Sequence, residues 1–160
     1  MRTLATRTPA RALVIAATVL GLVAELALAS SASADQVFHT QNIPLQPVNG
    51  ATFRSGFVVD IHANGQQVFA LERYVLNGAA SNTRYQVQLV IFLDSTCSGT
   101  PIVVPSAQVQ TNGAGNGEAA IRLTPQQVVG FRGITISIIW QVLNGTVVNF
   151  QTGCTVVVQD

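Results

Sequence analysis

The sequence is most informative in what it lacks. It contains no lysine and two histidines, and charged residues make up 9% of its 160 positions. Beyond residue 34, five arginines face six acidic residues. A chain this close to neutral has no long-range field that would steer it toward nucleic acid or an anionic membrane. We therefore expect no nucleic-acid partner and, once the N-terminus is processed, no membrane partner.

The scarcity of histidine limits the chemistry that the chain can perform. His39 and His62 are the only histidines, so a metal site built from a cluster of histidines is excluded. Asp60 and His62 lie two positions apart on one face of a predicted strand, which makes them the one candidate pair for a hydrolase. No Gly-x-Ser-x-Gly turn marks out a nucleophile. We interpret Asp60 and His62 as a solvated pair and expect no catalytic residue, no metal and no cofactor.

A glycine-rich stretch, Asn112–Gly117, brings the side-chain oxygens of Asn112 and Asn116 close to Glu118. Calcium loops need several acidic ligands, and this stretch offers a single carboxylate. We interpret it as a hairpin turn whose glycines adopt positive φ angles.

The N-terminus has the pattern of a targeting segment. Three arginines precede the apolar run Ala12–Ala29, in which Glu25 is the only charge, and Ala32-Ser33-Ala34 then supplies small residues for cleavage. This pattern is typical of a secretory signal peptide, whereas a spanning helix would need about 20 apolar residues without a central charge. We predict a signal peptide over residues 1–34 and a single secreted domain over residues 35–160.

Two cysteines remain in the predicted mature chain, Cys97 and Cys154. An even number of cysteines in an exported chain favours a disulfide, and two cysteines allow one pairing. We predict that Cys97 and Cys154 are bridged.

Alternation of apolar and polar residues predicts strands along most of the mature chain. It is clearest in Ser55–Ala63, in Tyr85–Leu93 and in Ile134–Leu143. Asn64-Gly65 is a strong hairpin signal. Thr124-Pro125-Gln126-Gln127 has the form of a capping box and predicts one helical turn. The pattern leaves room for eight or nine strands and no long helix, which indicates a β-sandwich or a barrel.

The run Asn82–Val87 resembles the Thr-x-Tyr-x-Val corner of fibronectin type III and related immunoglobulin-like domains. The resemblance implies an antiparallel immunoglobulin-like β-sandwich in which Thr83 and Tyr85 form a structural corner. Tyr85 would point inward, with its hydroxyl bonded to backbone near Leu76–Ala79. The chain is also similar to small exported bacterial proteins of this class that have no assigned activity.

A second resemblance is to the neocarzinostatin-type apoproteins, secreted bacterial sandwiches that hold an apolar chromophore. They share the Thr-x-Tyr corner, a following cysteine and a glycine-rich turn before a short strand, here Thr83/Tyr85, Cys97 and Asn112–Ala119. That family has two disulfides, whereas this chain can form one. The resemblance implies a carrier of a small apolar ligand.

The face opposite Tyr85 and Trp140 also carries apolar side chains, although the outer face of a sandwich should be polar. We call these side chains the outer stripe; they are Val90, Phe92, Ile139 and Leu143. Either the N-terminal part of the domain covers the outer stripe with Ile43 and Leu45, or the stripe is a candidate binding face.

These patterns give three hypotheses for function. The first is a secreted, non-enzymatic β-sandwich that serves as a binding, surface or structural module for an extracellular protein or glycan. The second is a carrier of a small apolar ligand, and the third is a hydrolase that uses Asp60 and His62. A flat apolar face would favour the first hypothesis, a wide crevice between the sheets the second, and a pocket that contains His62 the third.

Overall fold

The structure is a computed structural model that describes residues 38–63 and 69–158. The predicted signal peptide and the Asn64-Gly65 turn lie outside these residues. Within the described ranges, no helix is long and apolar enough to cross a membrane.

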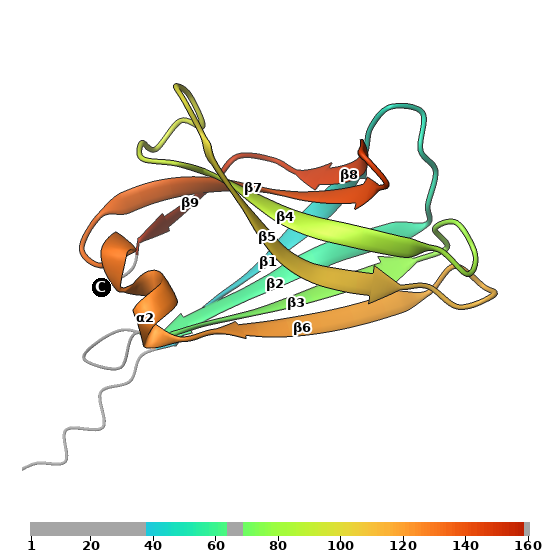
Figure 1. The fold of residues 1–160 in the computed structure, drawn as a ribbon, viewed down its shortest axis with the longest axis horizontal. Helices are drawn as coiled ribbons and strands as arrows, with labels where there is room; N and C mark the ends of the chain where they lie inside the picture. Colours follow the sequence, from blue (N-terminus) through green and yellow to red (C-terminus); the bar gives the residue numbers. More distant parts are fainter. Residues whose placement is uncertain (1–37, 64–68, 159–160) are drawn as a thin grey trace, which may run out of the picture. The chain divides into compact units, whose positions relative to one another are not determined.

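The described residues form nine strands, one four-residue helix and a short 3₁₀ segment (Figure 1). The elements are β1 (Phe38–Pro47), β2 (Ser55–Ala63), β3 (Ala70–Asn77), β4 (Arg84–Phe92), β5 (Ile102–Gln110), β6 (Gly117–Leu123), α2 (Pro125–Val128), η1 (Val129–Phe131), β7 (Thr135–Asn144), β8 (Val147–Thr152) and β9 (Thr155–Val158). The predicted all-β antiparallel class is confirmed.

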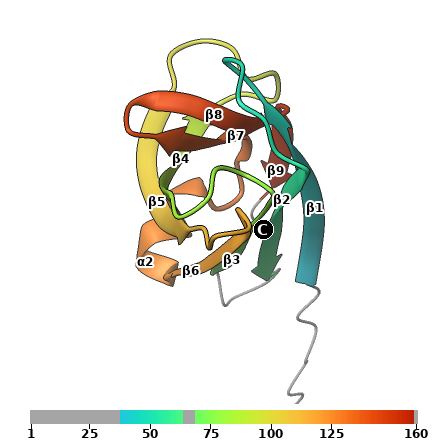
Figure 2. The same cartoon turned by 90° about the vertical axis from the view of Figure 1, so that its right-hand side faces the viewer.

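The strands form one continuous path in the order β5-β4-β7-β8-β1-β2-β3-β6, with β9 paired to β7. β1 makes this continuity possible because it pairs with β2 through Phe38–Pro44 and with β8 through Leu45–Pro47. A sandwich of two separate sheets would lack such a shared strand. The result is a nearly closed barrel, and Figure 2 shows its strands arranged around a common interior.

The two ends of the path, β5 and β6, lie side by side without a hydrogen-bonded ladder between them in the described residues. We call this gap in the barrel wall the seam. Pro105 lies in β5 and lacks a backbone N–H, so it suits a strand whose outer edge is unpaired. β5 continues through Pro105, with a shift of register opposite Gln86–Gln88.

The inward faces of β4 and β7 supply much of the core, as their alternation predicts. The main cluster includes Tyr85, Val87, Trp140 and Val142, each at most 2% exposed. The predicted helical turn is also confirmed, since Thr124 N–H donates to Gln127 Oε1 at 2.8 Å and α2 ends after four residues.

Tyr85 lies at the corner that leads into β4 and is 1% exposed. Its hydroxyl accepts a hydrogen bond from the Ala80 N–H at 3.2 Å, one residue beyond the range that the resemblance implies. Thr83 donates its own hydroxyl to the Ser81 carbonyl at 3.0 Å. The corner is therefore fixed by side-chain bonds to its own backbone.

The glycine-rich turn packs against this corner. The Ala79 N–H donates to the Gly115 carbonyl at 3.0 Å, and a Cβ at Gly115 would lie 2.0 Å from the Ala79 carbonyl oxygen. Asn112 Oδ1 accepts from two N–H groups of its own turn, and Asn116 Oδ1 accepts from the Gly78 N–H. These amide oxygens are thus engaged in holding the turn and the corner together.

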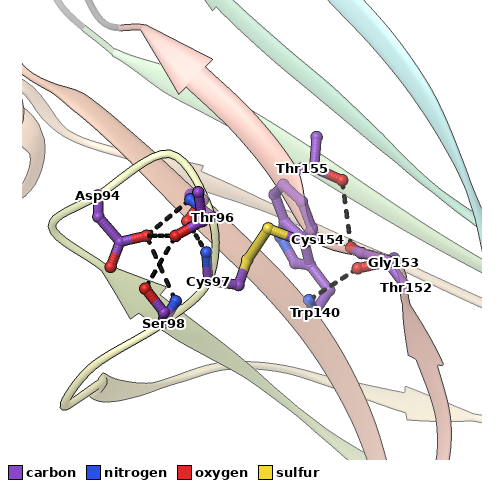
Figure 3. Close-up of a disulfide and its surroundings, with 10 residues drawn as sticks. Asp94, Thr96, Cys97, Ser98, Trp140, Thr152, Gly153, Cys154 and Thr155 are labelled. Atoms are coloured by element: carbon purple, nitrogen blue, oxygen red, sulfur yellow. Dashed lines mark hydrogen bonds between the residues drawn. A yellow bond between two sulfur atoms is a disulfide. The ribbon is translucent and has the colours of Figure 1, made fainter.

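The Cys97–Cys154 disulfide is present, with its Cα atoms 5.8 Å apart (Figure 3). It joins the loop after β4 to the residue before β9. Asp94 Oδ1 orders that loop by accepting from the Thr96 and Ser98 N–H groups, and the Cys97 N–H donates to Ser137 Oγ.

The outer stripe is largely covered. Val90 and Phe92 are each 8% exposed, while Ile139 and Leu143 are half-buried. Ile43 and Leu45 belong to the interior cluster, to which Val90 and Phe92 do not belong, so β1 fills the core and does not cover the stripe. The Cys97 loop lies beside Phe92 instead, since it bonds to Ser137, the register partner of Phe92.

We predict that Tyr85→Phe lowers the free energy of unfolding by about 1–2 kcal/mol, because the Ala80 N–H loses its buried acceptor. Urea denaturation of the two proteins measures the difference. Thr83→Val is the matched control, since its bond is local and its loss should cost at most about 0.5 kcal/mol. A loss below about 0.3 kcal/mol for Tyr85→Phe would mean that the corner bond does not stabilise the fold.

We predict that Phe92→Ser costs about 2–4 kcal/mol, because it removes a buried ring from a covered site. Denaturant melts beside wild type measure this cost, and Leu93→Ser serves as control because Leu93 is 65% exposed. If Phe92→Ser stays within about 0.5 kcal/mol of wild type, the ring contributes little to the fold and the outer stripe remains a candidate binding face.

Candidate functional site

Two acidic side chains face the interior from neighbouring strands. Asp60 of β2 is 3% exposed and Glu72 of β3 is 2% exposed. The two residues are direct register partners across the β2–β3 ladder, so their side chains leave the sheet on the same side. The interior therefore holds a pair of carboxyl groups.

The predicted solvated pair of Asp60 and His62 is wrong, because His62 is also 3% exposed. Asp60 and His62 lie on the buried face of β2 together with Val58. The more apolar face, which carries Phe57, Val59 and Ile61, is only half-buried. The reason lies in the neighbouring strand: Glu72 and Tyr74 are buried on β3, and register places the polar face of β2 beside them.

Glu72 is held by three donors from three strands. Trp140 Nε1 of β7 donates to Glu72 Oε1 at 3.1 Å, and Ser106 Oγ of β5 donates to Oε2 at 3.2 Å. The Tyr74 hydroxyl donates to the same Oε2 and lies 2.7 Å from Ser106 Oγ. We call these four residues the Glu72 network. Burial raises the pKa of Glu72, and these hydrogen bonds oppose that rise.

Asp60 is in the opposite situation. No described residue donates a hydrogen bond to its carboxyl group, although the group is as buried as Glu72. Burial, and secondly the negative charge of Glu72, raise the pKa of Asp60 to about 7. A carboxyl with this pKa titrates near neutral pH, and Asp60 accepts no hydrogen bond from the described residues.

Both acids line a cavity of about 270 Å³. Its wall is mostly aliphatic, with side chains from β4, β6, β7 and β9, and it includes Ser106 of the Glu72 network. Exposed residues also line it: Val104 and Pro105 at the seam, and Gln127 of α2. The cavity is thus bounded by residues of the seam and of the α2–η1 segment. Figure 1 shows that α2 lies at one end of the barrel.

His62 is absent from the residues that line this cavity. The hydrolase hypothesis needs His62 in the pocket with Asp60, so the geometry does not favour it. Among the described residues, no group of three His, Cys, Asp or Glu side chains is arranged to hold a metal ion. Glu118, the carboxylate of the calcium hypothesis, forms an ion pair with Arg73 at 2.7 Å.

Sequence reasoning overlooked the most polar part of the interior, Glu72, Tyr74 and Ser106. A signal was present in β3, where Ala70, Glu72, Tyr74 and Leu76 alternate with the outward residues. A glutamate in step with a tyrosine and a leucine indicates a buried acid with hydrogen-bond partners. Ser106 carried no such signal, because its role depends on the approach of β5 to β3 across the seam.

We predict that wild type is less stable at pH 8 than at pH 5. A carboxyl whose pKa is higher in the folded than in the unfolded state loses its stabilising protonation as pH rises toward the folded value. For Asp60 the window runs from about 4 to about 7, and the step from pH 5 to pH 8 crosses roughly two pKa units of it, which bounds the loss at about 3 kcal/mol. Urea unfolding at both pH values measures it.

The variant Asp60→Asn should reduce this pH dependence, and Glu72, whose pKa burial also raises, accounts for part of what remains. Glu118→Gln is the control, because Arg73 lowers the pKa of Glu118 and keeps it ionised across the window. Equal slopes for wild type and Asp60→Asn would contradict the assignment.

Comparisons with known proteins place no constraint on this site: no protein-family model, no curated protein and no solved structure matches the chain.

Proposed function

We propose that this protein is a secreted, non-enzymatic carrier that holds a small, largely apolar molecule inside its barrel. The observation that carries the proposal is the cavity of about 270 Å³, lined by aliphatic side chains and reached by two carboxyl groups. Small-molecule sites combine an apolar wall with a few polar groups that orient the ligand. In this proposal residues 1–34 are removed on export, and the disulfide suits an oxidising compartment.

The size of the cavity suggests the size of its occupant. A cavity of about 150 Å³ lined by apolar side chains binds benzene, so about 270 Å³ admits a molecule of two fused rings or a short branched chain. The aliphatic wall would favour such a molecule by removing its apolar surface from water. The carboxyl groups would select an orientation.

The architecture supports the carrier hypothesis over the general binding module. A binding module would use an exposed apolar face, but Val90 and Phe92 of the outer stripe are buried. A carrier needs an interior space, and the barrel has one beside an unpaired seam. The Tyr85 corner and Cys97 support the likeness to neocarzinostatin-type and other immunoglobulin-like sandwiches, although here β1 pairs with both halves of the barrel.

The test begins with protein from the culture supernatant of cells that express the full chain. We predict that this protein binds N-phenyl-1-naphthylamine, a neutral probe whose fluorescence rises in an apolar site. Native mass spectrometry of the same sample would also reveal a retained small molecule. The mass of the protein itself reports cleavage after Ala34.

The variant Ile121→Trp places a larger side chain in the cavity wall and should weaken probe binding at least about tenfold, since the ring occupies the ligand's space. Val147→Trp adds the same ring on β8, at a residue that is 52% exposed and does not line the cavity, and should bind as wild type does. Absence of probe binding by wild type, or equal binding by Ile121→Trp, would refute the carrier function.

A further inference from the structure

The two buried acids differ in what the protein provides for them. Three donors satisfy Glu72, whereas no described residue donates to Asp60. Asp60 is 3% exposed and lines the cavity. A carboxyl group held away from bulk water is costly to ionise unless hydrogen bonds compensate for the lost hydration. A ligand that donates to Asp60 would remove that cost.

No cationic side chain lines the cavity in the described part of the chain. The sequence has no lysine. Two arginines that are next in sequence to cavity-lining residues, Arg73 and Arg122, interact with other groups. Arg73 donates to Glu118 through two nitrogens, at 2.7 and 2.8 Å, on the exposed surface. Arg122 lies over the Phe69 ring at 4.5 Å from its centroid. The described residues that line the cavity therefore offer the acid pair no cationic partner.

We propose that the ligand is a small apolar molecule bearing a protonated amine, and that its ammonium group donates to Asp60. This inference rests on the carrier function proposed above. A buried charge is stable when it is paired, and an ammonium group would pair with Asp60 and lie in the field of Glu72. An anionic ligand would instead bring a further negative charge beside Asp60 and Glu72, which disfavours its binding.

The groups around Asp60 set the pH at which such a ligand binds. Glu72 and Tyr74 face it from β3, and His62 lies two residues along β2, in register with His39 of β1. On β1 the register partner of Asp60 itself is Gln41, which carries no charge. Glu72 is the principal charged neighbour, and it favours the protonated form of Asp60 in the empty protein. Binding of an ammonium group therefore becomes stronger as pH rises through the titration of Asp60.

Three probes of one shape test the proposal: 1-naphthylmethylamine, 1-naphthalenemethanol and 1-naphthoate, each displacing N-phenyl-1-naphthylamine. At pH 8 the amine should bind wild type at least about tenfold more tightly than the alcohol, and the naphthoate should bind most weakly. Between pH 8 and pH 5.5 the affinity for the amine should fall about thirtyfold, in proportion to the ionised fraction of a carboxyl with pKa about 7. The affinity for the alcohol should change less than about threefold.

Asp60→Asn should reduce amine affinity at pH 8 at least about tenfold and leave alcohol affinity within about twofold, which also shows that the cavity is intact. Glu118→Gln, which removes a surface carboxylate, should bind both probes as wild type does. If the alcohol binds wild type as tightly as the amine at pH 8, or if amine affinity does not depend on pH, the amine proposal is wrong while the carrier function stands. If N-phenyl-1-naphthylamine does not bind at all, the carrier function itself fails.

Discussion

The interior of this barrel depends on one buried carboxylate. Glu72 of β3 accepts hydrogen bonds from Trp140 of β7 and Ser106 of β5, so a single side chain connects strands from both halves of the barrel. Each hydrogen bond of this kind contributes about 1 kcal/mol, and burial of the carboxyl group opposes these gains by removing it from water. The net gain is therefore small, and the main effect of the network is to fix where β3, β5 and β7 stand relative to one another.

That placement explains why a cavity exists beside the network. β1 closes one side of the barrel by pairing with both β2 and β8, while β5 and β6 meet on the other side without a ladder. Ser106 holds β5 near β3 by a side chain, where a backbone ladder would have drawn β5 and β6 fully together. The space between them is filled only in part, by aliphatic side chains and the α2–η1 segment. The cavity is thus a consequence of a barrel that is closed by side chains along one seam.

Local features of the fold were predictable from the sequence. The Cys97–Cys154 bridge followed from the cysteine count, and the single helical turn at Pro125–Val128 followed from its capping residues. Alternation in β4 and β7 identified which face is buried, because one face there is plainly more apolar near Tyr85 and Trp140. Each of these signals depends either on residues that lie close together in the sequence or on a residue type that is rare in it, such as cysteine.

The candidate site was not predictable in the same way, because it depends on which strands become neighbours. In β2 the apolar face, with Phe57, Val59 and Ile61, is the outer one, and Asp60 and His62 turn inward. Hydrophobicity alone would predict that Phe57, Val59 and Ile61 form the buried face of β2. The polar face is accommodated inside because β3 brings Glu72 and Tyr74 into register with it. The hairpin signal at Asn64-Gly65 indicates that the two strands are neighbours and leaves open which of their faces is buried. Likewise, nothing in the sequence indicated that β1 would belong to both halves of the barrel.

Asp60 shows most clearly that this interior is not arranged for stability alone. At this position an asparagine or an aliphatic side chain would avoid a buried charge beside Glu72, whereas an ionised aspartate is costly there because no described residue donates a hydrogen bond to it. Glu72 offers a direct comparison, since it is equally buried yet surrounded by donors from three strands. The same barrel can therefore satisfy a buried acid where the fold requires one. Within the described residues it does so for Glu72 and not for Asp60, which lines the cavity. This asymmetry is expected when a ligand supplies the donor to Asp60.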